Sequence, residues 1–196
     1  MTGLQPDELL SPDPPFADEA ALVERLKAHD RDALRQVYRL HADGVYRYAL
    51  FQLGDWAAAE DVVSEVFLRL LKTIDQYEYR GIPLRAYLYR IARNLVVDQQ
   101  RRGNRLSPLE AAPSRLTQSV NPALVAEQQL GWEELQEAMR ELTEEQREVV
   151  MLRFVEGMDH RQVANVVGKS EASVKSLQHR ALAALRRILE RQPHER

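Results

Sequence analysis

The sequence contains no cysteine and only 8 glycines among its 196 residues. The absence of cysteine excludes a disulfide scaffold, a Cys-ligated zinc site and a thiol nucleophile. The small number of glycines, combined with 44% hydrophobic and 29% charged residues, favours helices over a turn-rich β fold. We therefore expect an all-α fold.

Long apolar runs are also missing, since no run approaches the roughly 18 residues that a membrane-spanning helix needs. Residues 1–24 contain six acidic residues and no Lys or Arg, which is the opposite of the basic start of a signal peptide. These features predict no membrane insertion and a cytoplasmic location.

Motifs for catalysis or metal binding are not recognisable. The 5 His residues show no metal-ligand spacing, and there is no P-loop, glycine-rich dinucleotide motif or nucleophile motif. The acidic residues Glu60, Asp61 and Glu65 are better explained as a solvated helix face, or as a docking surface for basic groups of a partner. We expect a protein that is not an enzyme and that needs no cofactor or metal.

Although the net charge is only −3, basic and acidic residues are concentrated in different segments of the chain. Residues 80–105 contain seven Arg and one Asp, and residues 168–192 contain six basic and two acidic residues. Between them, residues 127–159 contain ten acidic residues and three Arg. Local patches govern the encounter with phosphates more than total charge does. The basic segments are therefore candidates for nucleic-acid binding, with solvated helix faces as the alternative.

Proline-rich stretches divide the chain. Residues 1–17 contain four prolines among acidic and small residues, which is typical of a disordered acidic tail. Residues 103–122 contain three prolines and no apolar period, which is typical of a linker. We therefore expect one helical domain over 18–102 and a second over 123–191.

The first domain is expected to contain four helices, at about 18–29, 30–53, 55–72 and 83–102. Asp18 and Asp30 are candidate N-caps, and Gly54 followed by Asp55 ends one helix and starts the next. The third helix places hydrophobic residues at i, i+3 and i+4 spacing. Pro83 suits the first turn of the fourth helix.

The fourth helix has two contrasting faces. At the α-helical period, one arc is apolar and consists of Leu84, Leu88, Ile91, Ala92 and Leu95. Much of the remaining surface interleaves aromatic rings with guanidinium groups: Arg85, Tyr89, Arg90, Arg93 and Arg101, with Asn94 at its edge. Unstacked bases can lie on such rings while Arg holds the phosphate backbone. The alternative is an ordinary amphipathic helix whose tyrosines belong to the core.

The second domain carries the spacing of a helix-turn-helix. Ala164 is small where two helices must touch, and Gly168 follows at the turn, where a left-handed conformation is easiest for glycine. Ser170 is a candidate N-cap of the second helix. Val174 and Leu177 are expected to pack this helix against the core. The exposed positions of that helix are polar and suited to a major groove: Glu171, Ser173, Lys175, Ser176, His179 and Arg180.

A further helix is expected upstream, at about 144–156. Thr143 and Gln146 have the spacing of a capping box. The spacing of Val149, Val150, Leu152 and Phe154 places them in the core.

Two parts of the chain together resemble a known family. The first reads AEDVVSEVFLRLLK at 59–72 and PLRAYLYRIARNLVVDQQRR at 83–102, and the second reads LTEEQREVVMLRFVEGMDHRQVANVVGKSEASVKSLQHRALAALRR at 142–187. In this order and separation they resemble the sigma-70 family of RNA polymerase sigma factors, specifically the extracytoplasmic-function (ECF) group. Tyr87 departs from the pattern, because the family usually has Trp there.

The resemblance implies promoter recognition and DNA melting for transcription initiation by core RNA polymerase. It assigns polymerase docking to the third helix, at Asp61, Glu65, Phe67 and Leu68. It assigns capture of a flipped base of the −10 element to Tyr79, Arg80, Arg85, Tyr87, Tyr89, Arg90, Arg93 and Asn94. It assigns reading of the −35 element to Ser173, Lys175, Ser176, His179 and Arg180. An anti-sigma factor is the further partner that it implies, besides core polymerase and promoter DNA.

Two other classes of protein remain as alternatives. A LuxR-like regulator would have a similar helix-turn-helix without acting as a polymerase subunit, although the N-terminal domain shows only helical periods. An adaptor that binds polymerase without reading promoters would not need the basic and aromatic fourth helix. Internal masking of residues 80–105 by the acidic tail is the rival to an anti-sigma partner.

Overall fold

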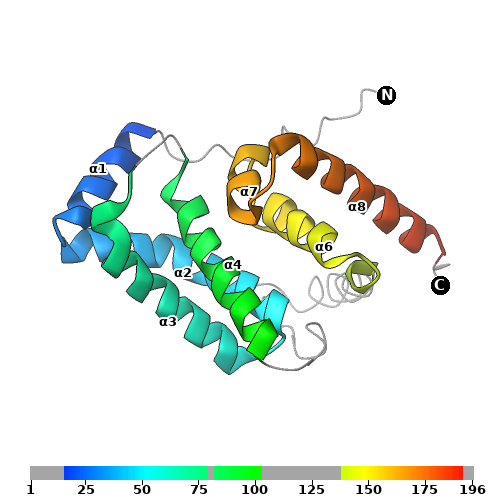
Figure 1. The fold of residues 1–196 in the computed structure, drawn as a ribbon, viewed down its shortest axis with the longest axis horizontal. Helices are drawn as coiled ribbons and strands as arrows, with labels where there is room; N and C mark the ends of the chain where they lie inside the picture. The colour runs from blue at the N-terminus through cyan, green and yellow to red at the C-terminus, as the bar shows by residue number, and fades with distance from the viewer. Residues whose placement is uncertain (1–15, 79–81, 103–137, 192–196) are drawn as a thin grey trace, which may run out of the picture.

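The computed structural model describes residues 16–78, 82–102 and 138–191, and all structural statements concern these ranges. Helices and their connections account for all of these residues, which confirms the all-α prediction (Figure 1). The predicted linker, most of the predicted tail, Tyr79 and Arg80 lie outside the described residues. Within the described ranges, no helix has both the length and the apolar character needed to cross a membrane.

The N-terminal part contains four helices, and the C-terminal part contains the helix-turn-helix and the helix before it. In chain order, the elements are α1 (Phe16–Lys27), α2 (Arg31–Leu53), α3 (Trp56–Thr73), the 3-10 turn η2 (Ile74–Gln76), α4 (Leu84–Arg102), α6 (Glu144–Val150), the π-helical turn η3 (Met151–Val155), α7 (His160–Val167) and α8 (Glu171–Arg191).

Local capping explains most of the helix ends. Asp30 accepts hydrogen bonds from the backbone N–H groups of Asp32 at 2.8 Å and Ala33 at 3.3 Å, which confirms it as the N-cap of α2. Gly54 ends α2 with a φ of 67°, and Asp55 then caps α3. The prediction for Asp18 was wrong, because α1 already begins at Phe16.

The N-terminal helices pack around one apolar core. The predicted arc of α4 is buried throughout, with Leu88 and Ala92 at 0% exposure. From α2 and α3, Val45 and Val66 are equally buried. The amphipathic spacing of the sequence therefore identified the core-facing side of α4 correctly.

The helix that Thr143 caps, α6, changes its period where η3 follows it. The capping box with Gln146 is present, but η3 follows α6, and the N–H of Glu156 bonds to the carbonyl of Met151, five residues earlier. This wider turn shifts the register of the side chains. Phe154, predicted in the core, is 41% exposed, whereas Arg153 is 2% exposed.

The N-terminal and C-terminal parts pack directly on each other. Helix α7 lies against α4, as Figure 1 shows near the middle of the molecule. A single buried cluster includes Leu88 and Ala92 of α4 together with Val163 and Val167 of α7. The described residues therefore form a closed arrangement, in which the C-terminal part covers one side of α4.

Candidate nucleic-acid interface

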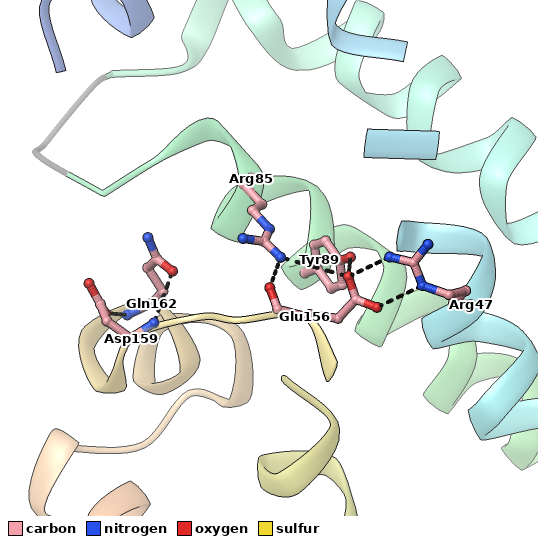
Figure 2. A network of polar contacts seen from close by, with 6 residues as sticks. All are labelled: Arg47, Arg85, Tyr89, Glu156, Asp159 and Gln162. Carbon is pink, nitrogen blue, oxygen red and sulfur yellow. Dashed lines mark hydrogen bonds and ion pairs between the residues drawn. The ribbon is translucent and has the colours of Figure 1, made fainter. Parts of the chain in front are cut away.

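The helix-turn-helix is built by local signals. Asp159 caps α7 through the N–H of Gln162 at 2.7 Å, and the Gln162 side chain accepts from the N–H of Asp159 at 3.1 Å (Figure 2). This second capping box was missed, although its Asp-x-x-Gln spacing is visible in the sequence. Gly168 ends α7 with a φ of 70°, a conformation that L side chains rarely adopt. The predicted turn glycine is therefore confirmed.

Helix α8 presents a polar face to solvent. Lys175, Ser176, His179 and Arg180 are exposed, while Ser173 is half-buried. The backbone N–H of Ser173 donates to Oγ of Ser170 at 3.2 Å, which confirms Ser170 as a capping residue. With Val174 and Leu177 buried on the opposite side, this face has the geometry of a recognition helix.

Gln178 holds the recognition helix in position, and sequence reasoning missed it. Its Oε1 accepts a hydrogen bond from Nε of Arg153 at 3.0 Å and lies 2.9 Å from Nε2 of His160. The guanidinium of buried Arg153 also donates to the carbonyl of Met158. Sequence reasoning did not place Arg153 in the core, because an arginine is seldom fully buried, although its spacing from Val149 and Val150 fits their buried face.

Helix α3 offers a separate surface of mixed character. Asp61 and Leu68 are exposed, Leu68 at 49%. Glu65 pairs with Arg69 at 2.8 Å, and this hydrogen bond lowers the pKa of Glu65. Phe67 is buried and packs against Tyr38, with 4.7 Å between ring centroids. Tyr38, which is 50% exposed, extends this surface and was missed by sequence reasoning.

A buried carboxylate from the C-terminal part occupies the basic face of α4. Glu156, which is 4% exposed, accepts a hydrogen bond from the hydroxyl of Tyr89 and is paired with Arg47 through both carboxylate oxygens at 3.3 Å (Figure 2). The guanidinium of Arg85 lies 3.7 Å from the same carboxylate and donates to the Glu156 carbonyl. Three side chains of the N-terminal helices thus converge on one carboxylate.

A second buried carboxylate repeats this pattern further along α4. Oε1 of Glu148 accepts from the hydroxyl of Tyr48 at 2.7 Å and from Nε of Arg93 at 2.9 Å. The rings of Tyr48 and Tyr89 meet edge to face, 5.6 Å apart. Burial, and then the adjacent carboxylates, raise the pKa of both tyrosines. Both phenols are therefore protonated donors at neutral pH.

The predicted −10 residues are consequently distributed over three environments. Arg85, Tyr89 and Arg93 lie in the interface with the C-terminal part. Tyr87 is half-buried, with its hydroxyl 2.7 Å from Oγ1 of Thr73 and its ring against Tyr77. Arg90 and Asn94 are exposed.

The carboxylates that cover α4 were visible in the sequence only as part of an acidic segment. Glu148 and Glu156 belong to the acidic residues of 127–159, and their partners Arg47 and Tyr48 lie on α2. In the sequence, the basic residues of 80–105 and the acidic residues of 127–159 lie in separate segments of the chain. The structure brings these two segments together.

Comparisons with known proteins agree on both parts of the chain. The Sigma-70 region 2 family model matches residues 37–106, and the Sigma-70, region 4 model matches residues 132–185. The ECF RNA polymerase sigma factor BldN of Streptomyces coelicolor is 37% identical over 172 residues, which span 86% of this chain and 64% of BldN. The ECF RNA polymerase sigma factor SigD of Mycobacterium tuberculosis is 33% identical over 85% of this chain and 81% of SigD.

A solved structure shares the fold. The sigma factor RpoE of Bartonella quintana, crystallised with the anti-sigma factor NepR, matches with a TM-score of 0.62 at 22% identity, over 81% of this chain and 97% of that one.

These matches settle the class of protein to which the chain belongs. The chain is a member of the sigma-70 family, in the group of ECF RNA polymerase sigma factors. A LuxR-like regulator, the alternative left open by the helix-turn-helix, receives no support from them.

Proposed function

We propose that this sigma factor directs core RNA polymerase to promoters by dividing the work among three surfaces. Helix α8 reads the −35 element, the Arg and Tyr face of α4 with the preceding loop captures the −10 element, and α3 docks on the polymerase. The observation that best supports the proposal is that α4 already binds anionic side chains of the same molecule. Arg85 and Arg93 already hold carboxylates there, and phosphates offer the same chemistry.

The assignment of individual residues follows their exposure. On α8, Lys175 and Arg180 are exposed cations suited to phosphates or guanine edges, and Ser176 and His179 complete the reading face. On α3, exposed Leu68 and Asp61 supply one apolar and one acidic contact for the polymerase, beside Phe67 and Glu65. On α4, Arg90 and Asn94 are accessible in the closed arrangement.

The remaining parts of the proposal concern class and partners. The protein acts by binding in the cytoplasm and has no catalytic activity of its own. Its partners are core RNA polymerase, promoter DNA and an anti-sigma factor. A sigma factor with similar fold was crystallised with an anti-sigma factor, which supports the last partner.

The test is transcription in vitro with purified core polymerase, with and without this protein. We expect initiation only when both are present, and only from templates that carry its −35 and −10 elements. The free protein should bind duplex promoter weakly, because two small reading surfaces reach high avidity only when polymerase sets their spacing. Tight sequence-specific binding of the free chain to duplex DNA would contradict the proposal.

The anti-sigma partner has its own test. Affinity purification from native cells should recover a stoichiometric protein that is not a polymerase subunit, and adding it should inhibit transcription in vitro. Deleting residues 1–15 should leave transcription by purified core polymerase nearly unchanged, since exposed charges are screened over about 8 Å at physiological salt. Strong activation by the deletion, without any such partner, would favour masking by the tail.

A further inference from the structure

Glu148 and Glu156 are the two buried acids of the C-terminal part that contact α4, at 6% and 4% exposure among the described residues. A buried carboxylate is unfavourable unless charges and hydrogen-bond donors compensate for its lost hydration. Each of these carboxylates has one tyrosine hydroxyl and at least one guanidinium from the N-terminal helices. The hydrogen bonds and ion pairs that replace the lost hydration of these carboxylates therefore form only while the C-terminal part is packed against the N-terminal helices.

Gly44 on α2 gives space to one of these contacts. A Cβ atom at this position would overlap the hydroxyl of Tyr89 and lie 2.8 Å from Oε2 of Glu156. Glycine inside a helix is less favourable than alanine, and Gly44 has no positive φ that would require it. The close approach of Tyr89 and Glu156 is thus the physical reason for glycine here.

The same contacts occupy groups that the proposed function assigns to DNA. Arg85, Tyr89 and Arg93 cannot hold a −10 strand while their donors are directed at Glu156 and Glu148. A carboxylate and a phosphate are both anionic oxygen acceptors, and they compete for the same donors. The closed arrangement and −10 binding therefore exclude each other at these three side chains.

We propose that Glu148 and Glu156 form an intramolecular lock, which holds the C-terminal domain over the −10 face of α4 and keeps the free sigma factor inactive. The inference rests on the proposed function for its biological consequence, but the lock itself is a property of this chain alone. Opening releases two carboxylates into water and frees Arg85, Tyr89 and Arg93 for DNA. We expect binding to core polymerase to supply the free energy for opening.

The absence of cysteine allows a direct test in the full-length chain. Exposed Gln36 on α2 and exposed Ala183 on α8 can be replaced by cysteine and labelled with a donor and acceptor dye. Energy transfer then reports whether the domains are closed, without polymerase or DNA. Transcription is measured in parallel on unlabelled chains that retain the native residues at these positions.

Two independent changes should open the lock. The double variant E148Q/E156Q removes both charges. G44A retains every carboxylate but places a Cβ 2.8 Å from Oε2 of Glu156, so that this carboxylate must move from its position beside Tyr89. Both should lower energy transfer and reduce the core polymerase concentration needed for half-maximal transcription, on the order of tenfold for the double variant. The control E141Q/E144Q removes two exposed acids of the same domain and should change neither readout.

Each outcome decides the proposal. Unchanged energy transfer in both lock variants would overturn it. Opening would also overturn it if the native chain supports transcription and the opened variants need the same core polymerase concentration as the native chain. If no variant supports transcription but E148Q/E156Q opens the chain, the proposed function fails while the lock remains. If E148Q/E156Q does not fold, G44A still tests the proposal, because this substitution alters no charged group.

Discussion

The hydroxyl of Tyr48 donates a 2.7 Å hydrogen bond to Oε1 of Glu148, which lies 100 residues later in the chain. Both side chains are buried, and Arg93 donates to the same oxygen at 2.9 Å. A residue of α2 and a residue of α6 are thereby joined beside α4. This contact links the stability of the whole chain to the accessibility of the Arg and Tyr face of α4.

Replacing Tyr48 by phenylalanine should therefore destabilise the protein. Glu148 would keep Arg93 but lose a buried donor, which costs about 1–3 kcal/mol of the free energy of unfolding. Urea denaturation monitored by circular dichroism measures the loss. Tyr38→Phe is the matched control, because that ring is 50% exposed, and its effect should stay within about 0.5 kcal/mol. Equal effects would contradict the assigned role of Tyr48.

Alkaline pH should weaken the fold through the same tyrosines. Burial raises the pKa of Tyr48 and Tyr89 above the ordinary value of about 10. A raised pKa in the folded state means that their contribution is fully present below about pH 10 and declines as the pH rises toward the folded pKa. The carboxylates of Glu148 and Glu156 also raise the pKa of the neighbouring tyrosines. Arg93 beside Tyr48 and Arg85 beside Tyr89 lower it, but by less.

Tyrosinate absorbance measures this effect. Of the 7 tyrosines, Tyr48 and Tyr89 should ionise only as the chain unfolds. The double variant Y48F/Y89F should lose the corresponding decline in stability above about pH 10. Ordinary titration of every tyrosine in the folded protein would show that the two phenols are not held as described.

Single substitutions on α3 and α4 should separate polymerase docking from promoter melting. Leu68→Ala should weaken binding to core polymerase by about tenfold, the effect of a modest interface hot spot. Asn94→Ala should impair open-complex formation and leave core binding nearly unchanged. The control Leu40→Ala removes another exposed leucine, on α2. Equal losses of core binding in all three variants would show that the surfaces are not divided in this way.

Substitutions on α8 should distinguish base reading from phosphate contact. Replacing Lys175 or Arg180 by alanine should reduce use of promoters that depend on the −35 element, by roughly 1–3 kcal/mol for a base contact. A lost phosphate contact would weaken all −35 sequences alike. Arg187→Ala is a matched control further along α8, because Arg187 and Arg180 both donate to their own helix, at 3.3 and 3.4 Å. An unchanged −35 preference would remove Lys175 and Arg180 from the reading surface.

The sequence alone determined features that depend on neighbouring residues. Asp30, Gly54 and Thr143 mark helix ends because capping involves groups within four residues. Ala164, Gly168 and Val174 identify the helix-turn-helix for the same reason, and the spacing of Leu88 and Ala92 predicts a buried face. Such signals are local, so they are readable without the fold.

Only the tertiary structure decided which residues meet across the chain. Nothing in the spacing of Tyr89 or Arg93 shows that carboxylates more than fifty residues later will cover them, because such pairing depends on how the C-terminal helices dock. The π-helical turn likewise leaves Phe154 41% exposed, although its spacing predicts burial, because a wider turn shifts the register of the side chains. The sequence therefore determined the helices and the basic and aromatic side chains that they carry, and the fold decided that the Arg and Tyr face of α4 is covered by the chain itself.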